Sequence, residues 1–222
     1  MKQYLSVLTL LAHSSIYKIC ILFAAMAAVH TLLFSVWSIR PLTAVLLFGV
    51  EVGILLWILC RNWLDTSGHQ SYTLQRLTVT PKEIFWIQSS YNLLCLLLFW
   101  AVHLIVAYVL YSRSLTGSQD LFLKFSGDGY LHGLMPGADW LAWAANLAIL
   151  ISAAVSAALY PVYRRLSMKK EGFILIAIAA YITLVFSNST NGLVMKLLFI
   201  IMSIVLPINM YRDIKRKEAK TS

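Results

Sequence analysis

Long apolar segments alternate with short polar ones along most of the chain. A helix that crosses a lipid bilayer needs about 20 consecutive, mostly apolar residues. The segments that approach this length are Tyr17 to Ile39, Leu42 to Cys60, Trp86 to Tyr111, Asp139 to Pro161, Gly172 to Ser187, and Leu193 to Met210. The pattern predicts an all-α integral membrane protein, with six transmembrane helices in one transmembrane domain.

The residues before the first apolar segment have a helical pattern of their own. Apolar side chains recur there at helical spacing, at Tyr4, Leu5, Leu8 and Leu11, with polar residues between and beside them. This predicts an amphipathic interfacial helix over residues 1–15. An early start of the first spanning helix is the open alternative, because Ser14-Ser15 is only a weak helix break.

A polar interruption, Arg61 to Glu83, separates the second and third apolar segments. Its last residues have the form of a helix start, with Thr80 as the N-cap, Pro81 at the first helical position and Glu83 closing a capping box. We therefore expect the third helix to begin at Pro81 and to continue without a break to Tyr111.

Composition and charge support a membrane location. The chain is 60% hydrophobic and 12% charged, whereas soluble domains have about 25% charged residues. Most of its 18 lysines and arginines fall in the termini and in alternate connections. By the positive-inside rule this puts both termini, the 61–83 segment and the basic tail 212–222 in the cytoplasm, and the 112–138 loop outside. The net charge of +9 then fits anionic lipid headgroups and predicts no nucleic-acid partner.

Four polar residues lie inside the predicted membrane helices, at similar depth below the outer ends: His30, Glu51, His103 and Asn146. Ionisable groups at such depth are costly and usually face protein or water. We expect an intramembrane polar layer in which Glu51 pairs with His30 or His103. Hydrogen bonding that holds the helices together and a substrate-facing or proton-linked role both remain open.

Catalytic and metal-binding motifs are absent from the chain. It has no Gly-x4-Gly-Lys-Ser/Thr loop for ATP, no His-Glu-x-x-His and no Gly-x-Ser-x-Gly. The cysteines, Cys20, Cys60 and Cys95, have no metal-like spacing. The sequence therefore predicts no catalytic residue, no metal site and no cofactor bound by this chain.

The run from Tyr72 to Ile84, reading YTLQRLTVTPKEI, resembles the segment between the second and third membrane helices of ABC-2-type transporter permeases. In that family the segment contains a coupling helix that docks into the ATPase subunit. The resemblance implies that the ATPase-coupling residues here are Leu74, Gln75, Arg76, Leu77, Lys82 and Glu83. The cytoplasmic termini, amphipathic amino-terminal segment and six helices agree with the family layout.

The resemblance implies a function in transport. The chain would be the permease subunit of an ATP-driven exporter in the cell membrane, paired with a second copy or a related permease. ATP and Mg would bind to a separate ATPase subunit, and the substrate would be a lipid, drug or peptide of hydrophobic or amphipathic character. The alternatives are an accessory or immunity membrane protein that does not transport, and a small proton-coupled carrier that uses Glu51 and the histidines.

Overall fold

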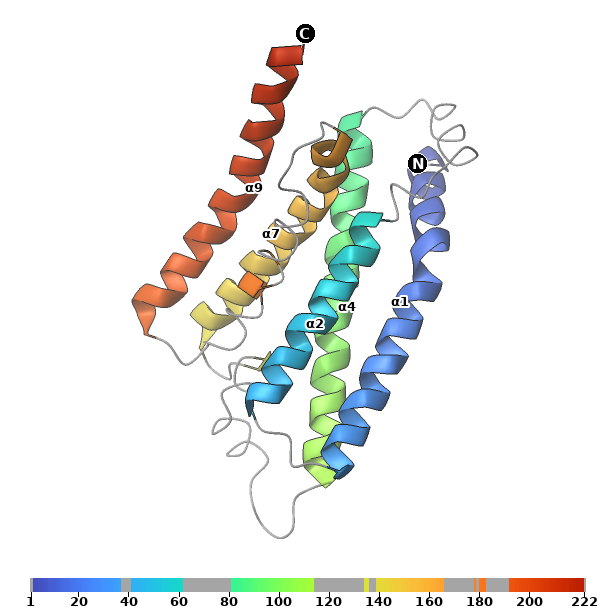
Figure 1. The fold of residues 1–222 in the computed structure, drawn as a ribbon, viewed down its shortest axis with the longest axis vertical. Coiled ribbons are helices and arrows are strands. Elements are labelled where there is room, and N and C mark those ends of the chain that lie inside the picture. Colours follow the sequence, from blue (N-terminus) through green and yellow to red (C-terminus); the bar gives the residue numbers. More distant parts are fainter. Residues whose placement is uncertain are drawn as a thin grey trace.

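The computed structural model describes residues 2–36, 41–61, 81–113, 134–135, 139–165, 178, 180–182 and 192–221, which are almost entirely helical and include no strand. The helices are α1 (Lys2–Val36), α2 (Pro41–Arg61), α4 (Pro81–Arg113), α7 (Trp140–Arg165) and α9 (Leu193–Thr221). They lie side by side along the long axis of the molecule (Figure 1). The protein is therefore an α-helical bundle in the part that the structure describes.

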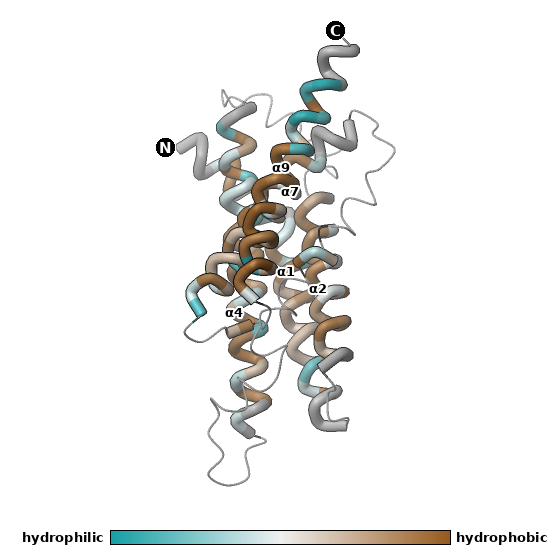
Figure 2. Tube along the Cα trace, turned by 90° about the vertical axis from the view of Figure 1, so that its left-hand side faces the viewer, coloured by the Kyte–Doolittle hydropathy of each residue, from teal (hydrophilic) through white to brown (hydrophobic). Residues whose placement is uncertain are grey.

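Four of these helices are long and apolar enough to cross a membrane, and α2 carries a shorter apolar stretch, Ala44–Cys60. Hydrophobic residues fill the middle of the bundle, and hydrophilic ones gather towards its ends (Figure 2). Many large apolar side chains are exposed on the outside, including Trp57, Ile105 and Ile201, as expected where lipid takes the place of water. The chain has the features of a multi-pass membrane protein. Most of the predicted fifth helix, Gly172 to Ser187, lies outside the described residues.

Residues 2–15 do not form a separate helix, which corrects the expectation of a distinct interfacial helix over residues 1–15. They are the first turns of α1, a single helix of 35 residues, and this matches the alternative of an early helix start. Ser15 does not interrupt the helix because its hydroxyl is satisfied there. Its Oγ donates to the Leu11 carbonyl at 2.8 Å and lies 2.5 Å from the Tyr91 hydroxyl of α4.

Helix α4 begins at Pro81, as the capping pattern predicted, and has Glu83 in its first turn. It continues without a break for 33 residues. At about 1.5 Å per residue this is roughly 50 Å, well beyond the hydrocarbon thickness of about 30 Å. Part of α4 must therefore extend past the apolar layer.

Helix α7 lies at the centre of the described bundle and contacts α9, α4 and α2. Small side chains make this close packing possible, since backbones approach most closely where residues are small. The buried small residues of α7 are Ala142, Ala145, Ser152, Ala153, Ala154, Ser156, Ala157 and Ala158. Asn92 of α4 joins the two helices by donating from Nδ2 to the Ala154 carbonyl at 3.2 Å.

The direction of the helices fixes which segments share an end of the bundle. The amino terminus, the end of α2, the start of α4, the end of α7 and the carboxyl terminus all lie at the same end (Figure 1). Helices α7 and α9 consequently run parallel. The chain between Arg165 and Leu193 has to return from one end of the bundle to the other.

Enlarging a buried alanine of α7 is expected to destabilise the bundle. Ala157 is fully buried, so the Ala157→Leu substitution should lower the free energy of unfolding by about 1–3 kcal/mol through overpacking. Thermal or denaturant unfolding of the purified protein in detergent measures the change. Ala101→Leu, on the exposed side of α4, is the matched control and should have little effect. Equal stability of the two variants would contradict the packing described for α7.

Candidate functional site

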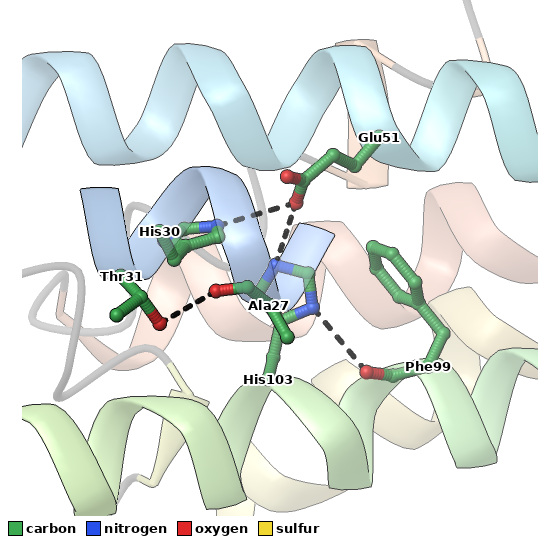
Figure 3. Close-up of polar contacts among 6 residues, drawn as sticks. All are labelled: Ala27, His30, Thr31, Glu51, Phe99 and His103. Carbon is green, nitrogen blue, oxygen red and sulfur yellow. Dashed lines mark hydrogen bonds and ion pairs between the residues drawn. The ribbon is translucent and has the colours of Figure 1, made fainter. Parts of the chain in front are cut away.

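Three ionisable side chains from three helices meet in the interior of the bundle. Glu51 of α2 places its Oε2 atom 2.9 Å from Nε2 of His103 on α4 and 3.4 Å from Nε2 of His30 on α1 (Figure 3). All three residues are buried, with relative exposures of 5%, 2% and 6% respectively. We refer to Glu51, His30 and His103 as the His–Glu–His cluster.

Helical periodicity places aromatic rings beside the cluster. Phe48 lies three residues before Glu51 and Phe99 lies four residues before His103, so each ring shares a helix face with its polar neighbour. The Phe48 and Phe99 rings are centred 4.9 Å and 4.4 Å from the His103 ring. The His30 and His103 rings meet edge to face at 5.4 Å. The polar atoms are thus enclosed by apolar rings, where electrostatic interactions are stronger than in water.

The second ring nitrogen of His103 sets the orientation of its imidazole. Nδ1 lies 3.3 Å from the backbone carbonyl oxygen of Phe99 (Figure 3). A carbonyl oxygen can only accept a hydrogen bond, so Nδ1 carries a proton and donates it. In the neutral imidazole Nε2 then has no proton, and its lone pair is on the side of the ring that faces the cluster.

The chemistry available to the cluster is that of two imidazoles and one carboxylate out of contact with water. Such a set can bind and release a proton, hold the helices together through hydrogen bonds, or ligate a cation. Its histidine nitrogens and carboxylate oxygen all lie within 4.8 Å of one another.

The structure brings together three of the four residues of the expected polar layer. Glu51 contacts both histidines, where the sequence suggested a pair with one of them. Asn146 is buried on α7, with 1% relative exposure, and its membership of the layer stays a prediction.

The expected coupling residues fall at the edge of the described chain. Leu74, Gln75, Arg76 and Leu77 lie outside the described residues, whereas Lys82 and Glu83 form part of the first turn of α4. Most of the 112–138 loop also lies outside them. The basic tail that begins at residue 212 continues α9 as far as Thr221.

An ion pair that the sequence analysis did not anticipate joins the first turns of α7 and α9. Asp139 caps α7 by accepting the Ala142 backbone N–H on Oδ1 at 3.2 Å, and its Oδ2 contacts Nζ of Lys196. The nearby Lys196 ammonium holds the pKa of Asp139 below its usual value. A signal was present in the sequence, since Asp139 stands directly before an apolar helix, where aspartate is a favoured N-cap.

Comparisons with known proteins found no match for this chain. The chain matches no protein-family model, and no curated protein or solved structure matched it. The observations therefore define a class and not a family: an α-helical bundle with four helices long and apolar enough to cross a membrane, and with a buried His–Glu–His cluster.

Glu51 and His103 are expected to be energetically coupled, because their side chains share a contact. Glu51→Gln and His103→Gln each leave a polar side chain of similar size, but they change the same contact. A double-mutant cycle on the free energy of unfolding in detergent should give a coupling of about 0.5–3 kcal/mol. His13→Gln is the control, since His13 is exposed on α1 and roughly 25 Å along the helix from His30 at 1.5 Å per residue. Additivity of Glu51→Gln with His103→Gln would contradict the contact.

The Asp139 and Lys196 ion pair should make stability depend on acid pH. The pKa of the Asp139 carboxyl is lowered in the folded state. The carboxylate therefore stabilises the folded state when the pH is above the unfolded-state pKa of about 3.9. This contribution is lost as the pH falls through the folded-state pKa. Asp139→Asn keeps the N-cap and removes the charge. Its deficit in apparent Tm should be largest near pH 7 and should shrink as the pH falls below the unfolded value of about 3.9. The exposed Asp213→Asn variant serves as the control, and a pH-independent deficit for Asp139→Asn would refute the assignment.

Proposed function

We propose that this protein is the permease subunit of an ATP-driven exporter. A separate ATPase subunit binds to residues 74–83 of the permease and drives its conformational change. The observation that carries the proposal is the geometry of α4. This helix begins at Pro81 and runs unbroken to Arg113, and its first turn lies at the same end of the bundle as both termini (Figure 1). A partner that binds beside this end has a rigid helix through which to act on the rest of the protein.

Continuity of the backbone supports transmission of movement along α4. From its first turn the helix leads to Tyr91, which contacts α1 through Ser15, and to Asn92, which bonds to the α7 backbone. Further along it reaches His103 in the His–Glu–His cluster. A shift imposed at Pro81 would therefore be felt by α1, α7 and α2, because a hydrogen-bonded helix moves largely as one body.

Charge supports the orientation that the proposal needs. The carboxyl-terminal turns of α9 expose Arg212, Lys215 and Arg216, and they lie at the end of the bundle that also holds the amino terminus (Figure 1). Basic residues near membrane helices favour the cytoplasmic side, where an ATPase obtains ATP. Anionic lipid headgroups would contact the same basic turns.

The proposed exporter contains two permeases and two ATPases. A second copy of this chain or a related permease completes the membrane part, and ATP and Mg bind to the ATPase subunits. The substrate is hydrophobic or amphipathic, such as a lipid, a drug or a peptide, because the described interior is apolar apart from a few buried polar groups. An accessory or immunity protein would share the bundle but would not need a partner at residues 74–83.

A carrier coupled to an ion gradient is a second candidate, and the His–Glu–His cluster is the observation that favours it. Ionisable residues inside a membrane commonly lie on ion or proton pathways. The two candidates differ in their energy source. If transport into vesicles requires ATP and continues after ion gradients are collapsed, the exporter is supported. If transport stops when the gradients are collapsed and does not require ATP, the carrier is supported.

Reversing charges in the proposed coupling segment should release the ATPase. The full chain is purified from its native membranes in mild detergent, and the ATPase that accompanies it is quantified by mass spectrometry. The Arg76→Glu, Glu83→Lys double variant keeps the net charge of the chain. It places each new charge opposite a partner charge of the same sign, and such like-charge pairs cost several kcal/mol at an interface. We expect the recovered ATPase to fall at least about tenfold, since about 1.4 kcal/mol corresponds to a factor of ten.

A matched control separates docking from a general effect of charge. The Arg212→Glu, Asp213→Lys double variant makes the same kind of exchange on exposed α9 residues at the same end of the bundle, and should recover as much ATPase as the unmodified chain. Absence of any ABC-type ATPase from the unmodified complex would overturn the proposal. Equal recovery from the two double variants would show that residues 74–83 are not the docking segment.

A further inference from the structure

We infer that His30, Glu51 and His103 form a binding site for a divalent first-row transition metal ion, with zinc the best suited. The ligand atoms are Nε2 of both histidines and Oε2 of Glu51, which lie within 4.8 Å of one another. Imidazole nitrogen and carboxylate oxygen are ligands that zinc accepts, and a set of two histidines and one glutamate occurs in known zinc sites. This inference does not depend on the proposed function, because it concerns the interior of a single chain.

The strongest observation is the environment of His103 Nε2. This atom is buried and makes no hydrogen bond of acceptable geometry among the described residues, although Glu51 Oε2 is only 2.9 Å away. Because Nδ1 carries the proton that faces the Phe99 carbonyl, the neutral ring presents a lone pair on Nε2. A lone pair and a carboxylate oxygen at this separation repel each other unless a positive charge lies close to both.

A metal ion satisfies this geometry better than a shared proton does. A proton between two atoms requires a nearly linear arrangement, and the short contact of His103 with Glu51 does not have one. A metal ion instead lies to the side of the line that joins its ligands. With bonds of about 2.0–2.2 Å, two ligand atoms are about 3.3 Å apart at a tetrahedral angle and about 2.9 Å apart at a right angle. The observed separations from Glu51 Oε2 are 3.4 Å and 2.9 Å.

The surroundings of the cluster match those of metal sites in proteins. Metal-ligating histidines almost always donate their other ring N–H to a carbonyl or carboxylate, which fixes the tautomer, and His103 does so to Phe99. The Phe48 and Phe99 rings pack against His103 and enclose the ligands in an apolar shell. One glutamate charge offsets part of the ion's charge. A water molecule or the other Glu51 oxygen would complete the coordination.

Sequence spacing could not reveal this site because its ligands come from three helices, α1, α2 and α4. Motifs for zinc place at least two ligands within a few residues of each other. A bound ion would link the three helices directly. Its expected effect is thus stabilisation of their mutual packing, since a ligand that binds only the folded state raises stability.

The test uses the full chain, purified in detergent through a tag that contains no histidine and stripped with a chelator. Zn²⁺ is then titrated, and bound metal is measured after dialysis by elemental mass spectrometry, together with the shift in Tm. Co²⁺ is added in parallel because its visible absorption reports the number and type of its ligands. We expect about one ion per chain, a rise in Tm with Zn²⁺, and a cobalt spectrum typical of nitrogen and oxygen ligands.

Substitutions of the ligands and one matched control decide the assignment. Glu51→Gln and His30→Gln should lower metal affinity at least about tenfold, since even residues that only support ligands cost 10–100-fold. His13→Gln, which removes an exposed histidine from the same helix, should bind metal like the unmodified chain. His30→Cys should retain cobalt and add a sulfur-to-cobalt charge-transfer band, which shows that the variant is folded and that position 30 is a ligand.

Two outcomes would overturn the inference. If the unmodified chain binds no stoichiometric metal and its Tm does not respond to Zn²⁺, the cluster is held by hydrogen bonds and protons alone. If Glu51→Gln and His30→Gln bind as tightly as His13→Gln, the metal lies elsewhere on the chain.

Discussion

Satisfaction of polar groups inside an apolar bundle is the constraint on which the rest of this structure depends. Lipid offers no hydrogen bonds, so a buried polar atom must find its partner within the protein. Side chains that return to the backbone meet much of this need, as Ser15 does with Leu11, Ser203 with Phe199, and Asn92 with Ala154 across two helices. Among the described residues, the place where at least three His, Cys, Asp or Glu side chains converge is the His–Glu–His cluster.

Different parts of the bundle meet this constraint in different ways. Between α4 and α7 the contact includes small residues of α7, the packed rings of Trp100 and Trp143, and a hydrogen bond from the Asn92 side-chain amide. At the start of α7 and α9 a partly exposed carboxylate caps one helix and pairs with a lysine of the other. Burial of polar groups is most costly around Glu51, because three titratable groups share a region lined by aromatic rings. The energetic cost of removing charges from water makes this the region where function is best sought.

Patterns that act locally along the chain were predicted well. The start of α4 at Pro81 follows from capping chemistry that involves neighbouring residues only. The apolar lengths of four spanning helices follow from composition. The pairing of Glu51 could also be anticipated, because depth along each helix is fixed by a constant rise per residue. The first two features need no knowledge of how the helices pack, and the third needs only that residues at the same depth can meet.

Features that depend on the rotation and contacts of helices were not predicted. The sequence could not show that Glu51 contacts both histidines at once, or that Lys196 meets Asp139 across 57 residues of chain. It also left open whether the amphipathic residues before position 15 form a separate helix, because Ser14-Ser15 is only a weak break. Packing decides the question, since Tyr91 provides a partner for Ser15 and the helix continues.

The parallel course of α7 and α9 has a consequence for the order of events during synthesis. Their contact is the most extensive between described helices, yet they cannot associate as a hairpin, since the chain must travel back across the bundle before α9 begins. The surface of α7 that packs against α9 therefore stays without this partner until α9 has been synthesised. Completion of the described bundle therefore has to wait for α9, and a truncation before residue 193 would leave part of the α7 surface without its packing partner.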